Sequence, residues 1–352
     1  MTGCALPRQL ETAGANDVFT VWDAAEPADR AAWLAAWNAW VRRDVFAHPG
    51  YQELSAGGTT RAMCASLTTD SGSVLFPFLL QDLAPLPCWG PDVGPAYDVT
   101  TNGYVGAFRT SELGEDDLAA RFWQRFDAWS AATGVVSEFV RMSIDADQLL
   151  PYPGEQATKR NIVRSLELDE PELWKDVRHK VRKNVKRARS EGVTVEIDPC
   201  GDRLDEFLAV YDGTMGRRSV ASQDAQGAEY FARLCSSLPG NFAFLHAVHG
   251  GQVVSSELVL FGAENAYSFL GGTDERHFEM RPNDLLKYEI ILGARSQGLR
   301  QYVLGGGRSP DDGIYRYKES FAPQGVVDYR GGWRVPRPEA YRRLTARSPG
   351  AD

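Results

Sequence analysis

A run of positive charge is the feature of this sequence with the clearest chemical meaning. Eight Lys or Arg residues fall within the fifteen residues from Lys175 to Arg189, although the whole chain has a formal net charge of −9. Like charges four residues apart destabilise a helix by roughly a few tenths of a kcal/mol per pair, so this density favours an anionic partner. A solvated helix face is the alternative. The negative overall charge argues against general nucleic-acid coating, which restricts the prediction to a local polyanion site.

Other reactive patterns are missing from the sequence. The five histidines and five cysteines are scattered without HExxH or CxxC spacing, and there is no GxSxG. We therefore expect no metal, no disulfide framework, no serine hydrolase and no cofactor. No apolar run approaches the roughly 18 to 20 residues that span a bilayer, and the N-terminus lacks a signal-peptide pattern. These features predict a cytoplasmic protein without a membrane span.

The basic run has the pattern of an amphipathic helix. Its apolar stripe consists of Leu173, Val177, Val181, Val185 and Ala188. We expect one continuous helix that docks by this stripe and ends at Gly192. The residues turned outward to bind the polyanion are Arg178, Arg182, Lys183, Lys186 and Arg189.

The elements around this helix repeat one order in both halves of the chain. The first half has a Trp-rich helix around residues 33–41, a hairpin of 62–68 with 74–82, a helix over 118–129 and a strand over 135–142. The second half has helices at 204–211 and 230–238, a hairpin of 242–248 with 252–261, a strand at 266–270, a helix over 285–296 and a strand at 302–304. Gly305 to Gly307 lacks nucleotide-binding spacing and is interpreted as a turn.

This alternation predicts an α+β fold of two related domains with mixed, largely antiparallel sheets flanked by helices. We place the first domain at 1–155 and the second at 156–330, opening with the basic helix. Residues 331–352 are expected to pack back on the first domain.

Several segments together resemble the Fem-type (FemABX-like) peptidyltransferases of the GNAT superfamily. They are the basic helix, RPNDLLKYEIILGARSQGLRQYVLGGG, DGIYRYKESFAP, and the first-half elements VGPAYD and NGYVGAF. The resemblance covers most of residues 45 to 330. It implies two tandem domains of the N-acetyltransferase fold and transfer of an amino acid from aminoacyl-tRNA to an amine.

The resemblance also implies two catalytic residues. Lys318, in YRYKESF, matches a family lysine whose ammonium would stabilise the oxyanion formed when an amine attacks the ester. A surface lysine paired with Glu319 is the alternative. Asp98, in GPAYD, matches the position that accepts a proton from the amine or orients it. A turn-capping role for Asp98 is equally compatible with its neighbours.

Further residues are expected at the substrate. Tyr104, Tyr267, Phe269 and Tyr317 would line the cleft, with core packing as the alternative for Phe269. Arg217 and Arg218 would hold an anionic group of the donor or acceptor, although one of them could simply cover the surface.

Two departures from known patterns narrow the substrates. The segment Arg276 to Asp284 lacks the glycines with which acetyl-CoA enzymes of this fold bind pyrophosphate, which disfavours CoA as donor. The early segment HPGYQELS lacks the basic residue that relatives bring to a UDP-linked diphosphate. We therefore expect a small peptide acceptor, free or tethered to a carrier protein, as in peptide antibiotic biosynthesis, with alanine as one candidate amino acid.

Three alternatives stay open at this stage. The protein could be an acyl-CoA-dependent N-acyltransferase, a peptidoglycan bridge-forming peptidyltransferase, or a noncatalytic RNA-binding protein that uses only the basic helix. No DNA partner is expected.

Overall fold

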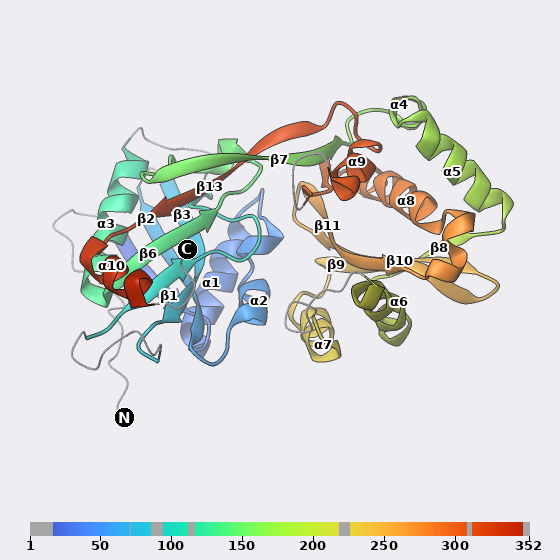
Figure 1. Ribbon diagram of the computed structural model, residues 1–352. Helices are drawn as coiled ribbons and strands as arrows, with labels where there is room; N and C mark the ends of the chain where they lie inside the picture. The colour runs from blue at the N-terminus through green and yellow to red at the C-terminus, as the bar shows by residue number, and fades with distance from the viewer. Residues whose placement is uncertain are drawn as a thin grey trace. The chain divides into compact units, whose positions relative to one another are not determined.

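The computed structural model describes residues 17–70, 72–85, 94–111, 117–217, 226–307 and 312–347. It divides the chain into two compact units (Figure 1). The first consists of Met1–Lys159 and Tyr329–Asp352, and the second of Arg160–Asp328. Within the described ranges, no helix combines the length and apolar character needed to cross a membrane.

The first unit is built on a mixed sheet in the order β1-β2-β3-β4-β6-β13. The strands β4 and β6 run parallel to each other, and β5 pairs with β3 in antiparallel orientation. The strands are β1 (Val18–Asp23), β2 (Thr60–Thr69), β3 (Gly72–Asp82), β4 (Tyr97–Thr100), β5 (Phe108–Arg109), β6 (Val135–Arg141) and β13 (Val326–Arg334). The helices are α1 (Pro27–Ala39), α2 (Pro49–Gln52), α3 (Leu118–Thr133) and α10 (Pro338–Arg347).

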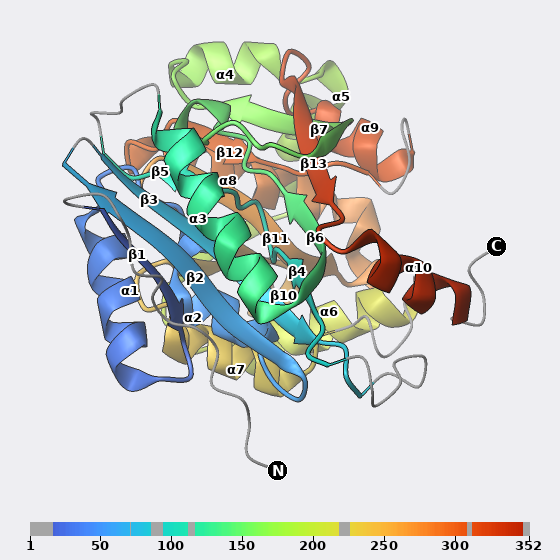
Figure 2. The ribbon, with the colours of Figure 1, turned by 90° about the vertical axis from the view of Figure 1, so that its left-hand side faces the viewer.

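Helices cover both faces of this sheet because β2 alternates its buried side chains. Met63, Ala65 and Leu67 share a core with α3, whereas Ala62 and Cys64 pack with Trp33 of α1. Figure 2 shows α3 lying across the strands. The C-terminal helix α10 contributes Ala340 and Leu344 to a small cluster with Leu83, Ala96 and Val136.

A buried ion pair ties β13 to β6 in the first unit. Arg334 donates to both carboxylate oxygens of Glu138 at 2.9 and 2.8 Å, and its other nitrogen lies 2.7 Å from Asp127. The Arg334 guanidinium also lies over the rings of Trp123 and Tyr152. Glu138 is therefore a buried acid whose charge is neutralised by a residue almost two hundred positions later in the sequence.

The second unit contains a sheet in the order β7-β12-β11-β10-β9-β8. Its strands are β7 (Glu155–Ser165), β8 (Thr194–Asp198), β9 (Phe242–His249), β10 (Gln252–Phe261), β11 (Asn265–Thr273) and β12 (Gln301–Val303). Its helices are α4 (Glu170–Asp176), α5 (His179–Ser190), α6 (Leu204–Arg217), α7 (Ala228–Ser237), α8 (Pro282–Ser296) and α9 (Gly313–Glu319). In this sheet β11 and β12 run parallel to each other.

Alternation along β9 again divides the packing between two faces. Ala243, Leu245 and Ala247 join the core that contains the apolar sides of α5 and α8. Phe244 points to the opposite face and contacts Phe207 of α6. The sheet is thus held between α5 and α8 on one side and α6 on the other.

The predicted continuous basic helix is wrong. The backbone leaves the helical region at Val177 and Arg178, so α4 ends at Asp176 and α5 begins at His179. The Arg178 amide donates to the carbonyl of Ser320 at 2.9 Å instead of to its own helix. The apolar stripe is nevertheless buried as predicted, from Leu173 through Ala188.

The predicted α+β architecture with mixed sheets flanked by helices is confirmed, and both predicted hairpins are present as β2–β3 and β9–β10. The strands β1, β4, β5, β7 and β13 are among those that the sequence did not predict.

Candidate functional site

A pocket of about 990 Å³ lies within the second unit where two parallel strands separate. The strands β11 and β12 pair only through Asn265–Tyr267 and Gln301–Val303. Beyond that point, residues 268–273 line one part of the pocket, and Gly306 and Gly307 line another. The first turn of α8, the helix α9, and residues of α6 and β10 also line the pocket. The glycine segment interpreted as a turn is thus part of this pocket.

Lys318 lines the pocket from α9. Its ammonium donates to the carbonyl of Gly306 at 2.9 Å, which fixes the side chain against the glycine segment. Glu319, the partner in the alternative interpretation, lies 3.6 Å from Arg178 instead. The neighbouring Tyr317 also lines the pocket and accepts a hydrogen bond from Asn283 at 2.8 Å. Burial raises the pKa of Tyr317 well above its usual value, so its hydroxyl stays protonated.

The helix that carries Lys318 begins at a capping aspartate. The Asp312 carboxylate accepts from the amide of Tyr315 at 2.7 Å, the usual N-cap geometry. We expect Asp312→Ala to lower the free energy of unfolding by about 1 kcal/mol, because the amide loses its acceptor. Urea denaturation measures this difference. Asp312→Ser keeps a capping oxygen and should recover most of the loss, and an equal loss in both variants would contradict a capping role.

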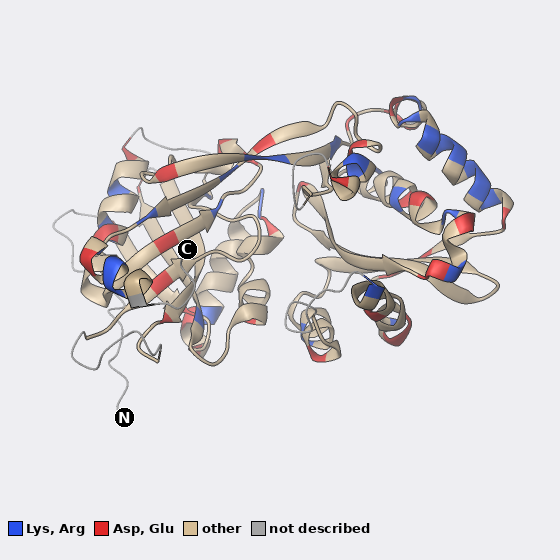
Figure 3. Cartoon of the chain, in the orientation of Figure 1, with Lys and Arg blue, Asp and Glu red and all other residues tan. Residues whose placement is uncertain are grey.

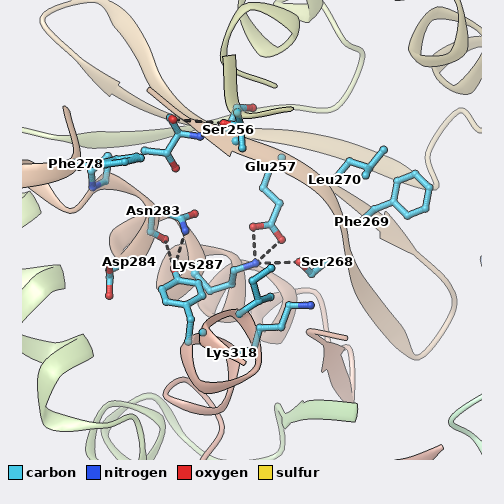
Figure 4. Close-up of a pocket in the computed structure, with 18 of the residues that line it drawn as sticks. Ser256, Glu257, Ser268, Phe269, Leu270, Phe278, Asn283, Asp284, Lys287 and Lys318 are labelled. Atoms are coloured by element: carbon cyan, nitrogen blue, oxygen red, sulfur yellow. Dashed lines mark hydrogen bonds and ion pairs between the residues drawn. The ribbon is translucent and has the colours of Figure 1, made fainter. Parts of the chain in front are cut away.

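A buried ion pair lies at the same pocket and was missed by the sequence analysis. Lys287 of α8 contacts both oxygens of Glu257 on β10, at 2.7 and 2.5 Å, and both residues are only 5% exposed. The Lys287 ammonium also reaches Ser268 at 3.0 Å and the Tyr302 hydroxyl at 3.1 Å. Figure 4 shows Glu257, Lys287 and Ser268 pointing toward one another. A lysine inside the apolar stretch LLKYEII was the available signal.

The remaining cleft residues predicted in this unit differ in position. Phe269 and Arg217 line the pocket, whereas Tyr267 is buried, with its hydroxyl 3.2 Å from Asn265, and is not among the lining residues. Arg217 donates to the carbonyl of Thr273 at 2.6 Å and lies over the ring of Phe278. Its guanidinium therefore supports the loop beside the pocket. Arg218 lies outside the described residues.

The start of α8 faces the pocket but is poorly suited to bind a pyrophosphate. Arg281 occupies the N-cap position with φ of 60°, and Pro282 follows it without an N–H donor. The Asp284 amide is bonded to the Arg281 carbonyl at 3.2 Å, and the Asp284 carboxylate also lines the pocket. Burial raises the pKa of that carboxylate. At other helix starts, free backbone amides bind phosphates. Here one such amide is absent at Pro282, and that of Asp284 already donates to a carbonyl.

The basic residues of α5 do not line this pocket, and they do not form a uniform set. Asn184 donates to Asp284 at 3.0 Å, which joins α5 to the pocket lining. Arg182 donates to the carbonyls that end α4, and Arg189 forms an ion pair with Glu289 at 2.7 Å. Lys183 and Lys186 are exposed and form no ion pair with any residue that the structure describes. Figure 3 shows positive charge along the whole of α5.

Two predicted site residues belong to the first unit. Asp98 lies inside β4 rather than in a turn and accepts from the Ser137 hydroxyl at 2.5 Å, next to it in the parallel β4–β6 register. Burial raises the pKa of Asp98, and the hydrogen bond from Ser137 offsets part of this effect. Tyr104 packs against Phe46 and Tyr329.

The raised pKa of Asp98 has a measurable effect on stability. The protonated carboxyl stabilises the fold at acidic pH, and this contribution is lost as pH rises through the raised pKa. Asp98→Asn keeps an oxygen for Ser137 but does not titrate. The Tm of the variant relative to the wild type should therefore be higher at about pH 8 than at about pH 4, by roughly 2 °C. An unchanged Tm difference between the two conditions would show that Asp98 titrates normally.

Comparison with known proteins supports the fold and the second unit's family. Residues 175–319 match the family model described as acetyltransferase (GNAT) domain. The structure of FemX aligns with a TM-score of 0.65 at 13% identity, covering 89% of this chain and 97% of that one. No curated protein sequence matches.

Two further solved structures share this arrangement. One is the C-terminal domain (DUF2156) of an Agrobacterium fabrum protein provisionally named lysylphosphatidylglycerol synthetase. It has a TM-score of 0.56 at 15% identity over 92% of this chain and 99% of that one. The other is a conserved protein of unknown function from Bacteroides thetaiotaomicron VPI-5482, with a TM-score of 0.50 at 12% identity over 87% and 97%. Residues 175–319 therefore match the acetyltransferase (GNAT) domain model, and 89% of the chain shares the fold of FemX.

Proposed function

We propose that the protein transfers an amino acid from aminoacyl-tRNA to an amine and so forms a peptide bond. The observation that carries this proposal is the Lys318 ammonium at the pocket, held by the Gly306 carbonyl at 2.9 Å. The acceptor nitrogen attacks the ester carbonyl, a C–N bond forms, and the C–O bond to the tRNA ribose breaks. The amine loses one proton and the released ribose oxygen gains one. A fixed cation beside the carbonyl stabilises the oxyanion between these steps.

The basic face of α5 supports tRNA as the carrier of the donor. Lys183 and Lys186 are exposed beside a helix that contacts the pocket lining through Asn184 and Asp284. An RNA backbone along α5 would thus bring its 3′ end toward the ester-binding pocket. Lysines that form no ion pair among the described residues contribute most to the affinity for such phosphates, because phosphate binding to them releases counterions.

The acceptor in this proposal is a small peptide, free or tethered to a carrier protein, with Asp98 assisting deprotonation of its amine. The raised pKa of Asp98 makes its carboxylate a stronger base than that of an exposed aspartate. Peptide antibiotic biosynthesis is the setting that this acceptor chemistry favours over a UDP-linked wall precursor.

The test is acceptor-dependent release of label from charged tRNA. The protein would be incubated with radiolabelled aminoacyl-tRNAs, alanyl-tRNA included, and a panel of peptide amines. We expect release from one or a few tRNAs, together with a labelled peptide product. No acceptor-dependent release from any tRNA would overturn the proposal.

A second candidate is an acyl-CoA-dependent N-acyltransferase, favoured by the acetyltransferase family match over residues 175–319. Two residues at the start of α8 weigh against this candidate. Pro282 has no amide N–H to donate to a pyrophosphate, and Asp284 adds a carboxylate to the pocket lining. Thermal stabilisation by CoA and transfer of labelled acetyl from acetyl-CoA would favour this candidate. Absence of both would remove it.

A further inference from the structure

The ion pair between Glu257 and Lys287 is placed where it can contact a ligand. Both residues line the pocket, together with Ser268, and they come from β10, α8 and β11 (Figure 4). An ion pair this deeply buried is an inefficient way to stabilise a core, because desolvation of the two charges offsets most of their attraction. A function at the pocket would account for its presence.

The hydrogen bonds within this cluster leave one oxygen of Glu257 able to accept a hydrogen bond from a ligand. Lys287 has three N–H donors and four acceptor atoms around it, so its donors are used. Glu257 Oε1 accepts from Lys287 and from the Tyr302 hydroxyl, whereas Oε2 accepts from Lys287 alone among the described residues. A carboxylate oxygen has two lone pairs, so Oε2 keeps room for one more donor.

Ser268 adds a hydroxyl group to the pocket lining beside Glu257 and Lys287 (Figure 4). Its oxygen accepts from Lys287, a hydrogen bond also joins it to Tyr302, and the residue is only partly buried. The pocket therefore offers a carboxylate acceptor and a hydroxyl side by side. A small group with N–H donors beside a carbonyl matches this pair.

We propose that Glu257, held in place by Lys287, binds the free α-amino group of the amino acid carried by the donor. This inference rests on the proposed function, because it assumes an aminoacyl ester in the pocket. Lys287 is a positioning residue that orients the Glu257 carboxylate through contacts to both of its oxygens. The site then distinguishes aminoacyl donors from acyl donors that lack a free amine.

The test compares three donors made from one amino acid on one tRNA. They carry a free α-amino group, an α-hydroxyl group in its place, or an N-acetylated amine, and kcat/KM for transfer to one peptide acceptor is measured. The wild type should use the free-amine donor roughly 10- to 100-fold better than either of the others, the range expected for a hydrogen bond to a charged group.

Variants of Glu257 and Lys287 test whether this ion pair causes the preference for the free-amine donor. Glu257→Gln should lower kcat/KM for the free-amine donor by at least about 10-fold and leave the hydroxyl donor nearly unchanged. If this variant folds poorly because Lys287 loses its counter-charge, the double variant Glu257→Gln/Lys287→Met removes both charges at similar volume and should show the same loss of preference. Glu206→Gln, on α6 outside the pocket lining, is the control with wild-type preference.

The outcomes separate this inference from the proposed function. Equal use of all three donors by the wild type, or a preference that survives in both variants, would overturn the role of Glu257 while leaving aminoacyl transfer intact. Transfer from none of the three donors would overturn both.

Discussion

Lys318→Met should lower kcat for acyl transfer roughly 100- to 1000-fold, with a much smaller change in KM. The ammonium lines the pocket and is oriented by the Gly306 carbonyl, so it is in place before the oxyanion develops. An interaction made mainly in the transition state affects kcat when it is removed. Steady-state kinetics with labelled aminoacyl-tRNA and a fixed acceptor measure the change.

Two further variants make the Lys318 result interpretable. Lys159→Met removes an exposed lysine elsewhere and should keep wild-type kinetics. Lys318→Arg keeps a positive charge but offers a planar guanidinium, and should restore only part of the rate. Full activity in Lys318→Met would remove Lys318 from the mechanism. Full tRNA binding with no transfer by the wild type under any condition would favour the noncatalytic RNA-binding alternative.

The double variant Lys183→Glu/Lys186→Glu should bind tRNA roughly 30-fold more weakly at low salt. Each lysine that contacts a phosphate adds about one to the slope of log affinity against log salt, so the slope should fall by about two. Both side chains are exposed on α5, and neither has an ion-pair partner among the residues described. Filter binding across a salt series measures both quantities.

The matched control reverses the charge at two arginine positions on another helix. Arg342→Glu/Arg343→Glu changes the net charge equally on exposed positions of α10 in the first unit. It should leave the affinity and slope nearly unchanged. A minimal donor, such as a short aminoacylated RNA hairpin, should also lose less affinity in the α5 variant than full-length tRNA does. Equal losses in both double variants would indicate a general charge effect.

The parts of the fold that the sequence predicts are those with strong local patterns. The hairpin β9–β10 has apolar strands on either side of a Gly-Gly turn, and α8 has a regular apolar stripe. The strand β7 has six exposed positions at its start, so its sequence lacks the alternation that identifies a strand. Its pairing is decided by partners far away in the chain.

The break between α4 and α5 had no local signal. Neither Pro nor Gly interrupts the basic run, and the apolar stripe continues through it. The helix ends because the Arg178 amide bonds to Ser320, about 140 residues later. A tertiary hydrogen bond of this kind overrides helix propensity and cannot be read from the local sequence.

The candidate site likewise contains one residue that a local sequence pattern identifies and others that only the fold brings together. A short sequence pattern singled out Lys318, and the structure places it at the pocket. Glu257 and Lys287 are thirty residues apart, on a strand and a helix, so only the fold brings them together. A charged residue inside an apolar element is the pattern that deserves a search for a buried partner.

The position of the second unit within the sequence of the first has a consequence for synthesis. A ribosome completes Arg160–Asp328 before it makes the part of β13 from Tyr329 onward and α10, which belong to the first unit. The second unit can therefore fold while the first still lacks an edge strand. Until Arg334 emerges, Glu138 has no cation to neutralise it, so a nascent first unit holds an unpaired acid at the place where β13 will add. Although it begins first, the N-terminal unit is expected to be the last to reach its native state.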